Sequence, residues 1–235
     1  MKSTSLITHL AKLIILFILP LSAYASTIET LSSWNGSGIG NFGEDSYGGN
    51  IDSGVYATYG QTFYLSSGND NILQSISFYV NDNWTQSNPI HFGIYLYEWN
   101  GSSITGNSLF ESQPLSTNKS NDYEKFTVNT GGIFLNTNTS YVAFMSASNY
   151  FDGNIGYGQT GYTSNSYLEG GYVYMNNKDD FIKLSTSSWA SNNDIDLAFQ
   201  LDFTPVPIPS SLWIFGSGLI SLLGFVRYKK SNMNP

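Results

Sequence analysis

Apolar and polar residues alternate in two stretches of the chain with the two-residue period of a half-buried strand. In residues 194–203 the apolar positions are Ile195, Leu197, Phe199, Leu201 and Phe203. In residues 89–99 one side of the pattern carries Ile90, Phe92, Ile94 and Leu96, and the other carries His91, Gly93, Tyr95, Tyr97 and Trp99. Because side chains alternate across a strand, each stretch is predicted to have one face in a core.

Further strands are predicted at residues 59–65, 72–80, 123–128, 141–146 and 171–175, and near 181–184. The Asn- and Gly-containing runs at 100–103 and 129–132 predict tight turns. No stretch between residues 26 and 205 shows a sustained helical period. Eight or nine short strands with such turns predict an all-β fold, a single antiparallel β-sandwich with a jelly-roll or galactose-binding-like connection in preference to a barrel.

Two segments show little strand pattern. Residues 26–58 are expected to be a loop-rich N-terminal part of the ectodomain, and the sandwich itself is expected at 59–203. The run from Ser148 to Gly171 is rich in Gly, Tyr and Asn and is long for a connection. It is interpreted as either a binding loop or an extra hairpin.

The N-terminus has the pattern of a secretory signal peptide. Lys2 and Lys12 flank a polar start, residues 13–21 are almost wholly apolar, and Ala23-Tyr24-Ala25 supplies the small-x-small motif. Signal peptidase is therefore expected to remove residues 1–25 by cutting after Ala25. The alternative is a retained anchor, but the apolar run is shorter than the ~20 residues that a spanning helix needs.

The C-terminal pattern predicts a second membrane segment. Residues 204–209 form a proline-rich linker, and residues 210–226 form an apolar stretch of 17 residues. At ~1.5 Å per residue this stretch covers about 25 Å of a hydrocarbon core about 30 Å thick. The basic residues that follow predict a cytoplasmic tail at 227–235 and an ectodomain outside the inner membrane.

This tail resembles the PEP-CTERM sorting signal of bacterial surface proteins, which an exosortase recognises. The resemblance assigns Pro207 and Pro209 to the signature, residues 212–226 to the helix, and the basic cluster to Arg227, Lys229 and Lys230. Ile208 stands where the commonest form has glutamate, as in a variant whose signature lacks the acid, and this leaves open which exosortase acts. The alternative is a single-helix anchor that is never cut. Residues 60–203 also resemble, through looser motifs, the exported β-sandwich domains that accompany such tails.

The charge of the ectodomain argues against anionic partners. All 17 acidic residues of the chain lie between Glu29 and Asp202, and the basic residues there are four lysines, so the net charge is 4 − 17 = −13. No arginine occurs in this part. Because phosphate recognition depends on arginine and lysine, nucleic acid and anionic lipid are discarded as partners. The chain has no cysteine, so its core is expected to hold without disulfides.

Sugar binding is one candidate activity. Pyranose rings stack on aromatic faces, and the row formed by Tyr95, Tyr97 and Trp99 on one predicted strand can present such a platform. Loop tryptophans that can extend this platform are Trp34, Trp84 and Trp189. The alternative is that a second sheet covers the row and makes it part of the core.

Catalysis has less support in the sequence. His91 is the one histidine of the mature chain, lies in a strand pattern, and is interpreted as a structural residue. No spacing of zinc ligands appears. A glycosidase needs only two carboxylates whose separation the sequence does not give. The candidate acids for that reaction are Glu98, Glu111, Glu124 and Glu169.

Calcium is the one metal with candidate ligands, and no other cofactor is expected. Asp70, Asp82, Asp179 and Asp180 lie in Asn- and Asp-rich turns that offer hard oxygen ligands, but none matches an EF-hand loop. Solvated turns are the alternative interpretation. The five Asn-x-Ser/Thr sequons are attributed to turn composition.

Two functions follow from these patterns. The first is an exported, non-enzymatic surface or extracellular-matrix protein, processed by signal peptidase and an exosortase and associated with exopolysaccharide in a biofilm. It passes through an inner-membrane intermediate held by the C-terminal helix. The alternative is a carbohydrate-binding module or a glycoside-cleaving enzyme.

Overall fold

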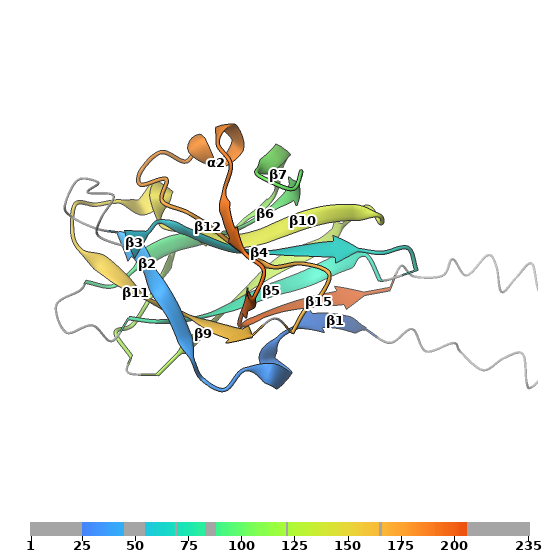
Figure 1. Cartoon of the computed structure of the whole chain (residues 1–235), viewed down its shortest axis with the longest axis horizontal. Helices are drawn as coiled ribbons and strands as arrows, with labels where there is room; N and C mark the ends of the chain where they lie inside the picture. Colours follow the sequence, from blue (N-terminus) through green and yellow to red (C-terminus); the bar gives the residue numbers. More distant parts are fainter. Residues whose placement is uncertain are drawn as a thin grey trace, which may run out of the picture. The chain divides into compact units, whose positions relative to one another are not determined.

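The structure is a computed structural model that describes residues 25–44, 55–68, 70–82, 88–120, 122–164 and 166–205. The chain divides into two compact units, Met1–Pro205 and Val206–Pro235, and all described residues lie in the first. Most of the described residues are in strands, arranged in two sheets whose strand pairs are antiparallel apart from the β2–β3 pair (Figure 1). The predicted all-β class with antiparallel sheets is confirmed. The jelly-roll or galactose-binding-like connection stays a prediction.

The larger sheet has eight strands in the order β1-β15-β5-β11-β2-β3, with β9 also paired to β5 and β14 to β11. Its strands are β1 (Ser26–Glu29), β2 (Gly38–Glu44), β3 (Val55–Tyr56), β5 (Ile72–Asn81), β9 (Glu124–Phe134), β11 (Gly156–Ser164), β14 (Ile195–Leu197) and β15 (Phe199–Thr204). The first and last strands pair directly, with Ser26 opposite Phe203. The two ends of the described domain therefore lie side by side.

The smaller sheet has seven strands in the order β13-β12-β4-β10-β6-β7, with β8 also paired to β6. Its strands are β4 (Thr58–Leu65), β6 (His91–Trp99), β7 (Ile104–Glu111), β8 (Leu115–Ser116), β10 (Thr139–Ser146), β12 (Tyr172–Met175) and β13 (Ala190–Asn192). In Figure 1 its strands β4, β6 and β10 form the upper layer, and β1, β5, β9 and β15 form the lower one.

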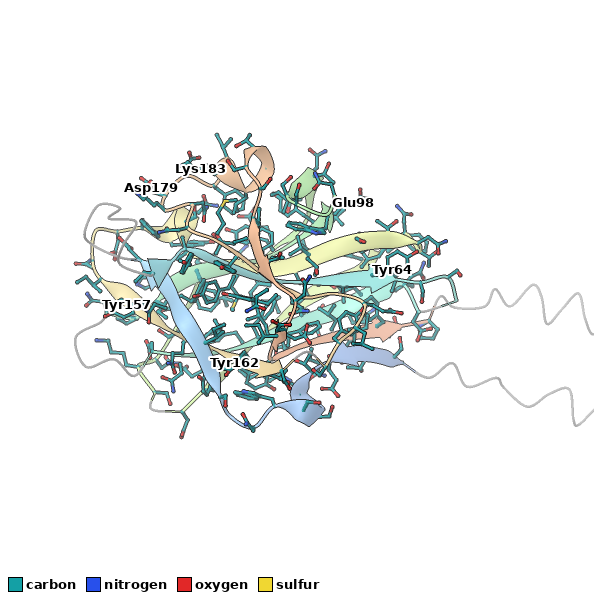
Figure 2. All side chains as sticks on the ribbon, viewed as in Figure 1. Tyr64, Glu98, Tyr157, Tyr162, Asp179 and Lys183 are labelled. Atoms are coloured by element: carbon teal, nitrogen blue, oxygen red, sulfur yellow. The ribbon has the colours of Figure 1, made fainter. Side chains whose placement is uncertain are left out.

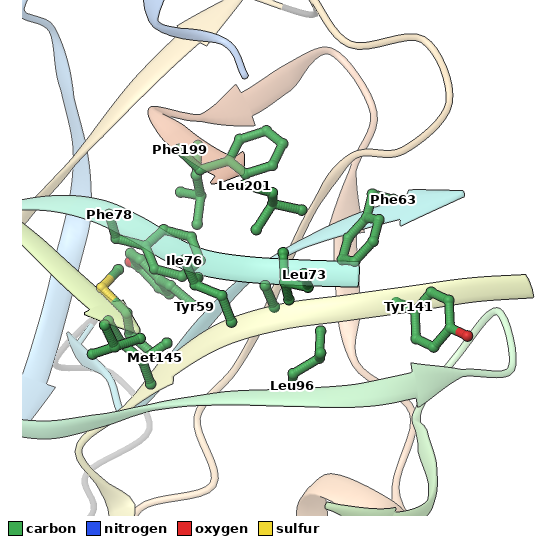
Figure 3. Packing of buried hydrophobic residues seen from close by; sticks show 14 of the residues in the cluster. Tyr59, Phe63, Leu73, Ile76, Phe78, Leu96, Tyr141, Met145, Phe199 and Leu201 are labelled. Carbon is green, nitrogen blue, oxygen red and sulfur yellow. The ribbon is translucent and has the colours of Figure 1, made fainter. Parts of the chain in front are cut away.

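The main core lies between the two sheets, because each sheet turns one apolar face toward the other. Phe78 and Leu201 of the larger sheet and Leu96 and Met145 of the smaller sheet belong to one cluster of buried side chains (Figure 3). The predicted inward row of β6 is confirmed by the complete burial of Ile90, Phe92, Ile94 and Leu96. Burial of such side chains stabilises the fold by about 1.5–3 kcal/mol each.

Helical structure is scarce in the described part of the chain. It holds two 3-10 turns, η1 (Leu31–Ser33) and η3 (Ser148–Tyr150), and one four-residue α-helix, α2 (Lys183–Thr186). No helix among these residues has the length and apolar character to cross a membrane. The predicted membrane helix at 210–226 lies outside the described residues. The strand predicted near 181–184 was wrong, since α2 begins within that range.

The single strand predicted at residues 194–203 is broken at Ala198. Leu197 belongs to β14, which pairs with β11, whereas Phe199 begins β15, which pairs with β5. The Thr30 side chain fills the break: its hydroxyl donates to the Leu197 carbonyl at 2.6 Å and accepts from the Phe199 N–H at 3.1 Å. The chain thus changes its strand partner without leaving these two backbone groups unpaired.

Three segments interpreted as loops or turns hold strands instead. Residues 26–58 contribute β1, β2 and β3, so the two-sheet fold begins well before residue 59. The Gly/Tyr-rich stretch at 148–171 contains β11, which is neither a loop nor an extra hairpin but a strand within the larger sheet. Residues 129–132 lie inside β9 as a bulge, where Gly131 and Gly132 have φ of 76° and 89°.

Candidate functional site

The predicted stacking row lies on the outward face of β6, and its three side chains differ in how far they are exposed. Tyr95 is 1 % exposed and belongs to a second buried cluster, while Tyr97 and Trp99 are half-buried and pack against that cluster. The Tyr95 ring stacks on Phe144 at 5.1 Å, and its hydroxyl accepts a hydrogen bond from Asn149 Nδ2 at 3.2 Å. Tyr95 is therefore a core residue, and only the other two rings reach the surface.

A chain segment rather than a second sheet covers the row. This covering segment, residues 176–189, stands on the upper layer in Figure 1 and includes α2. Its Phe181 ring lies 4.9 Å from Tyr95, and its Trp189 ring lies 5.5 Å from Trp99 in an edge-to-face contact. Trp189 also donates from Nε1 to the Leu184 carbonyl at 2.8 Å. Trp189, named as an extension of the platform, is thus part of its cover.

Buried polar contacts fix the covering segment to the sheet. Asn177 is fully buried; its Oδ1 accepts from the Thr58 hydroxyl at 2.8 Å, and its Nδ2 donates to Ser148 Oγ at 2.9 Å and to the Asp180 carbonyl at 3.1 Å. At the exposed tip, Lys183 and Asp180 form an ion pair at 3.8 Å (Figure 2 labels Lys183). The buried amide contributes more to the fixation than the exposed pair does.

Two of the glutamates named for glycoside cleavage lie on opposite faces of the smaller sheet. Glu98 lies opposite Tyr141 on the inward side of β6, and Glu111 lies opposite Tyr95 on the outward side of the same sheet. Glu124 binds Asn118 through both oxygens, at 2.8 Å from the backbone N–H and 2.5 Å from Nδ2. Glu169 is exposed in the turn between β11 and β12.

The carboxylates named as calcium ligands are separate from one another in the described chain, apart from the neighbours Asp179 and Asp180. Asp82 is buried; its Oδ2 accepts from the Thr117 hydroxyl, and its Oδ1 has no hydrogen-bond partner among the described residues. Asp70 is half-buried before β5. Across the described residues no group of three or more His, Asp or Glu side chains is placed to hold a metal ion.

Two other buried carboxylates have structural partners. Both Glu44 oxygens accept backbone N–H groups, from Gly153 at 2.7 Å and Asp152 at 2.9 Å. Asp196 accepts from the backbone N–H groups of Ser166 and Tyr167 at 2.7 and 2.9 Å. Each of these carboxylates thus binds the backbone of a connecting loop and holds it against a strand of the larger sheet.

The outward face of the larger sheet carries an aromatic group that no local sequence pattern indicated. Trp34 follows η1 and lies over Gly161 of β11, where an added Cβ would come within 2.8 Å of the indole. The Trp34 ring is 4.9 Å from Tyr79 of β5 and 5.1 Å from Tyr123, which precedes β9. All three rings are half-buried. Trp34 had been named only as an addition to the row on β6, which lies in the other sheet.

Polar side chains surround these three rings. Tyr123 donates from its hydroxyl to Gln159 Oε1 at 3.4 Å, and burial raises the pKa of that phenol. The Lys125 ammonium lies 5.9 Å from the Tyr79 ring centre and donates to Gln200 Oε1 at 3.1 Å. Rings that combine apolar faces with nearby donors and acceptors can bind ligands that have both kinds of surface. We call Trp34, Tyr79 and Tyr123 the aromatic triad.

Several predicted site residues lie outside the described residues. These are Ala23 of the cleavage motif, Trp84, and the sorting residues Pro207, Pro209, Arg227, Lys229 and Lys230. Ala25 is described and lies exposed immediately before β1.

Comparison with known proteins gives little beyond the structure itself. No family model and no curated protein matches the chain. Two similar solved structures are of Cwp84 from Clostridium difficile. One holds the cysteine protease and lectin-like domains of this surface layer associated protein, with a TM-score of 0.41, 9% identity, and coverage of 63% of this chain and 32% of that one. The other is the Clostridial cysteine protease Cwp84 after propeptide cleavage, with a TM-score of 0.48, 10% identity, and coverage of 77% and 40%. The chain spans less than half the length of either, and similarity at this level carries no conclusion about its activity.

Proposed function

We propose that the chain is an exported surface or extracellular-matrix protein that an exosortase sorts and processes, and that its two-sheet domain is the part displayed outside the cell. The observation that carries this proposal is the fit between the fold and the sorting segments. Strand β1 begins at Ser26, one residue after the expected cleavage site at Ala25, and β15 ends at Thr204, just before the proline signature. Cleavage at either place therefore removes no strand from the described sheets.

The composition of the domain supports the same proposal. Its fold holds without cysteine, so it does not depend on oxidation after export. A net charge of −13 in residues 26–205, from 4 − 17, favours solubility and opposes adsorption to anionic lipid. A displayed domain of this kind works by binding.

The processing proposal is tested in the producing organism by mass spectrometry of the surface-exposed protein. The expected result is an N-terminus at Ser26 and the loss of peptides from residues 210–235. Deletion of the exosortase is expected to leave the full-length tail in the inner membrane. Replacing Pro207 and Pro209 together by alanine is expected to have the same effect, whereas Pro205→Ala, a matched change outside the signature, is expected to leave processing intact. An intact tail on all surface-exposed protein would overturn the proposal.

A further inference from the structure

The outward face of the larger sheet carries a continuous polar surface next to the aromatic triad. Strand register places Gln200 opposite Ser77 and Asp202 opposite Ser75, and Ser77 in turn opposite Thr127. The alternate residues of the same strands are buried in the main core. Since side chains alternate across a strand, the polar set faces away from the core on β15, β5 and β9, and Thr27, opposite Asp202, extends it to β1. Ser77 is fully buried within this set, so the accessible groups are those of Thr27, Ser75, Thr127, Gln200 and Asp202.

Hydrogen bonds between these side chains hold the surface in one arrangement. Asp202 accepts from the Ser75 hydroxyl at 2.6 Å, from Gln200 Nε2 at 2.8 Å and from the Thr27 hydroxyl at 3.1 Å. Ser77 and Thr127 share a hydrogen bond at 2.9 Å. A surface ordered in advance loses less side-chain entropy when a ligand binds to it.

The size of the surface suits a ligand longer than a single sugar ring. Four neighbouring strands separated by three gaps of ~4.8 Å span about 14 Å. The aromatic triad adjoins these rows through Tyr79, which follows Ser75 and Ser77 on the same face of β5, and it offers ring faces to the apolar C–H side of a pyranose. The hydroxyl and amide groups of the polar rows match the hydroxyl groups of the sugar, because both kinds of group donate and accept hydrogen bonds.

We propose that this face, comprising the aromatic triad and the polar rows of β1, β15, β5 and β9, binds an extended, uncharged polysaccharide. The charge pattern favours a neutral polymer. Lys125 is the cation beside the triad, and Gln200, which accepts from its ammonium, donates to the Asp202 carboxylate. A domain of net charge −13, from 4 − 17, repels acidic polymers. The inference deepens the proposed function and rests on it only for the source of the polymer.

The test is affinity electrophoresis of the full-length protein, purified in mild detergent, through gels that contain a defined polymer. The probes are hydroxyethyl cellulose and dextran as neutral polymers, alginate as an acidic one, and exopolysaccharide from the producing organism. Retardation by at least one neutral polymer is expected. Tyr79→Ala is expected to weaken polymer binding about tenfold or more, because the variant loses a central aromatic ring. Thr127→Val keeps the shape and strand preference of the residue but removes its hydroxyl, and it is expected to weaken polymer binding by a smaller, measurable factor.

A matched variant on the opposite sheet distinguishes this face from the row on β6. Tyr64 is a half-buried tyrosine of β4, labelled in Figure 2, whose hydroxyl donates to Asn138 at 3.5 Å. Tyr64→Ala is expected to retain binding. Thermal melting of each variant separates loss of binding from loss of fold. Binding that survives Tyr79→Ala but fails in Tyr64→Ala or Trp99→Ala would overturn the inference, as would binding to alginate alone or to no polymer. None of these outcomes bears on tail processing, which the mass spectrometry measures separately.

Discussion

A buried hydrogen bond between Gln61 and Asp196 links the two sheets. Gln61 is on β4 of the smaller sheet and Asp196 on β14 of the larger sheet; both are fully buried, and Gln61 Nε2 donates to Asp196 Oδ1 at 2.8 Å. The side-chain oxygen Oε1 of Gln61 accepts from the Leu197 N–H at 2.9 Å. Every oxygen of the two side chains thus has a partner, which is the condition under which a buried carboxylate is tolerated.

Asp196→Asn is expected to destabilise the protein by about 2–3 kcal/mol, because an amide nitrogen would replace one carboxylate oxygen and at least one buried donor would lose its acceptor. Denaturant unfolding monitored by tryptophan fluorescence measures the change. Asp194→Asn makes the same substitution at an exposed position two residues earlier and is expected to have little effect. Equal stability of the two variants would show that the Gln61–Asp196 hydrogen bond does not contribute to the stability of the fold.

Asn177 gives a second prediction, which concerns the covering segment. Asn177→Ala leaves the Thr58 and Ser148 hydroxyls without their amide partner in a buried site and is expected to cost about 1–3 kcal/mol. Hydrogen exchange should rise in residues 176–189 more than in β4 or β10, since the amide fixes this segment specifically.

Asn176→Ala is the matched control for that experiment. Asn176 is the preceding residue and is only half-buried, so its loss should change exchange little. If Asn177→Ala raised exchange uniformly across both sheets, the segment would be an inseparable part of the core rather than a cover held at one point.

The regular strands of the interior were predictable from local pattern. Residues 59–65, 72–80 and 141–146 coincide closely with β4, β5 and β10 because their inward positions are large apolar residues. Strand β11 lacked that pattern, since its buried positions include Gly158 and Thr160. A Cβ added at Gly158 would lie 2.0 Å from the Asn81 carbonyl oxygen, so glycine there serves the close approach of β5 and gives no apolar periodicity.

The candidate site was less predictable, because its surroundings come from distant parts of the chain. The alternation in residues 89–99 correctly separated two faces of β6, but nothing local indicated that residues 176–189 fold over Tyr95. The aromatic triad likewise joins residues 34, 79 and 123, which the pattern placed in a loop and in two separate predicted strands. Proximity of this kind follows from strand order, which a single sequence does not encode locally.

Buried tyrosines predict how stability changes at high pH. Burial raises the pKa of Tyr59 from its ordinary value of 10.0 to about 12, and that of Tyr167 to about 12, because the interior disfavours the phenolate. A raised pKa contributes stability that is complete below pH 10, where the phenols are protonated in both states. That stability is lost as the pH rises from 10 to 12, since the unfolded state releases its protons first.

The free energy of unfolding is therefore expected to fall steeply between pH 10 and 12. Spectrophotometric titration should show part of the phenolate signal appearing only with unfolding, whereas the chain in denaturant should titrate near pH 10. Tyr59→Phe is expected to make the decline less steep. Titration of all tyrosines near pH 10 with the fold intact would contradict the buried placement of Tyr59 and Tyr167.

Asp202 predicts the opposite trend at low pH. Its partial burial acts to raise the pKa, but hydrogen bonds from Ser75, Gln200 and Thr27 outweigh that effect and hold the pKa below the ordinary value of 3.8. A lowered pKa contributes stability that is present above pH 3.8 and lost as the pH falls through the folded-state value. Asp202→Asn is therefore expected to be less stable than the wild type at pH 7, with a difference that narrows below pH 3.8. Thermal melting at a series of pH values measures this, with Asp194→Asn as the exposed control, and a difference that stayed constant down to pH 2 would refute the assignment of the effect to the carboxylate charge.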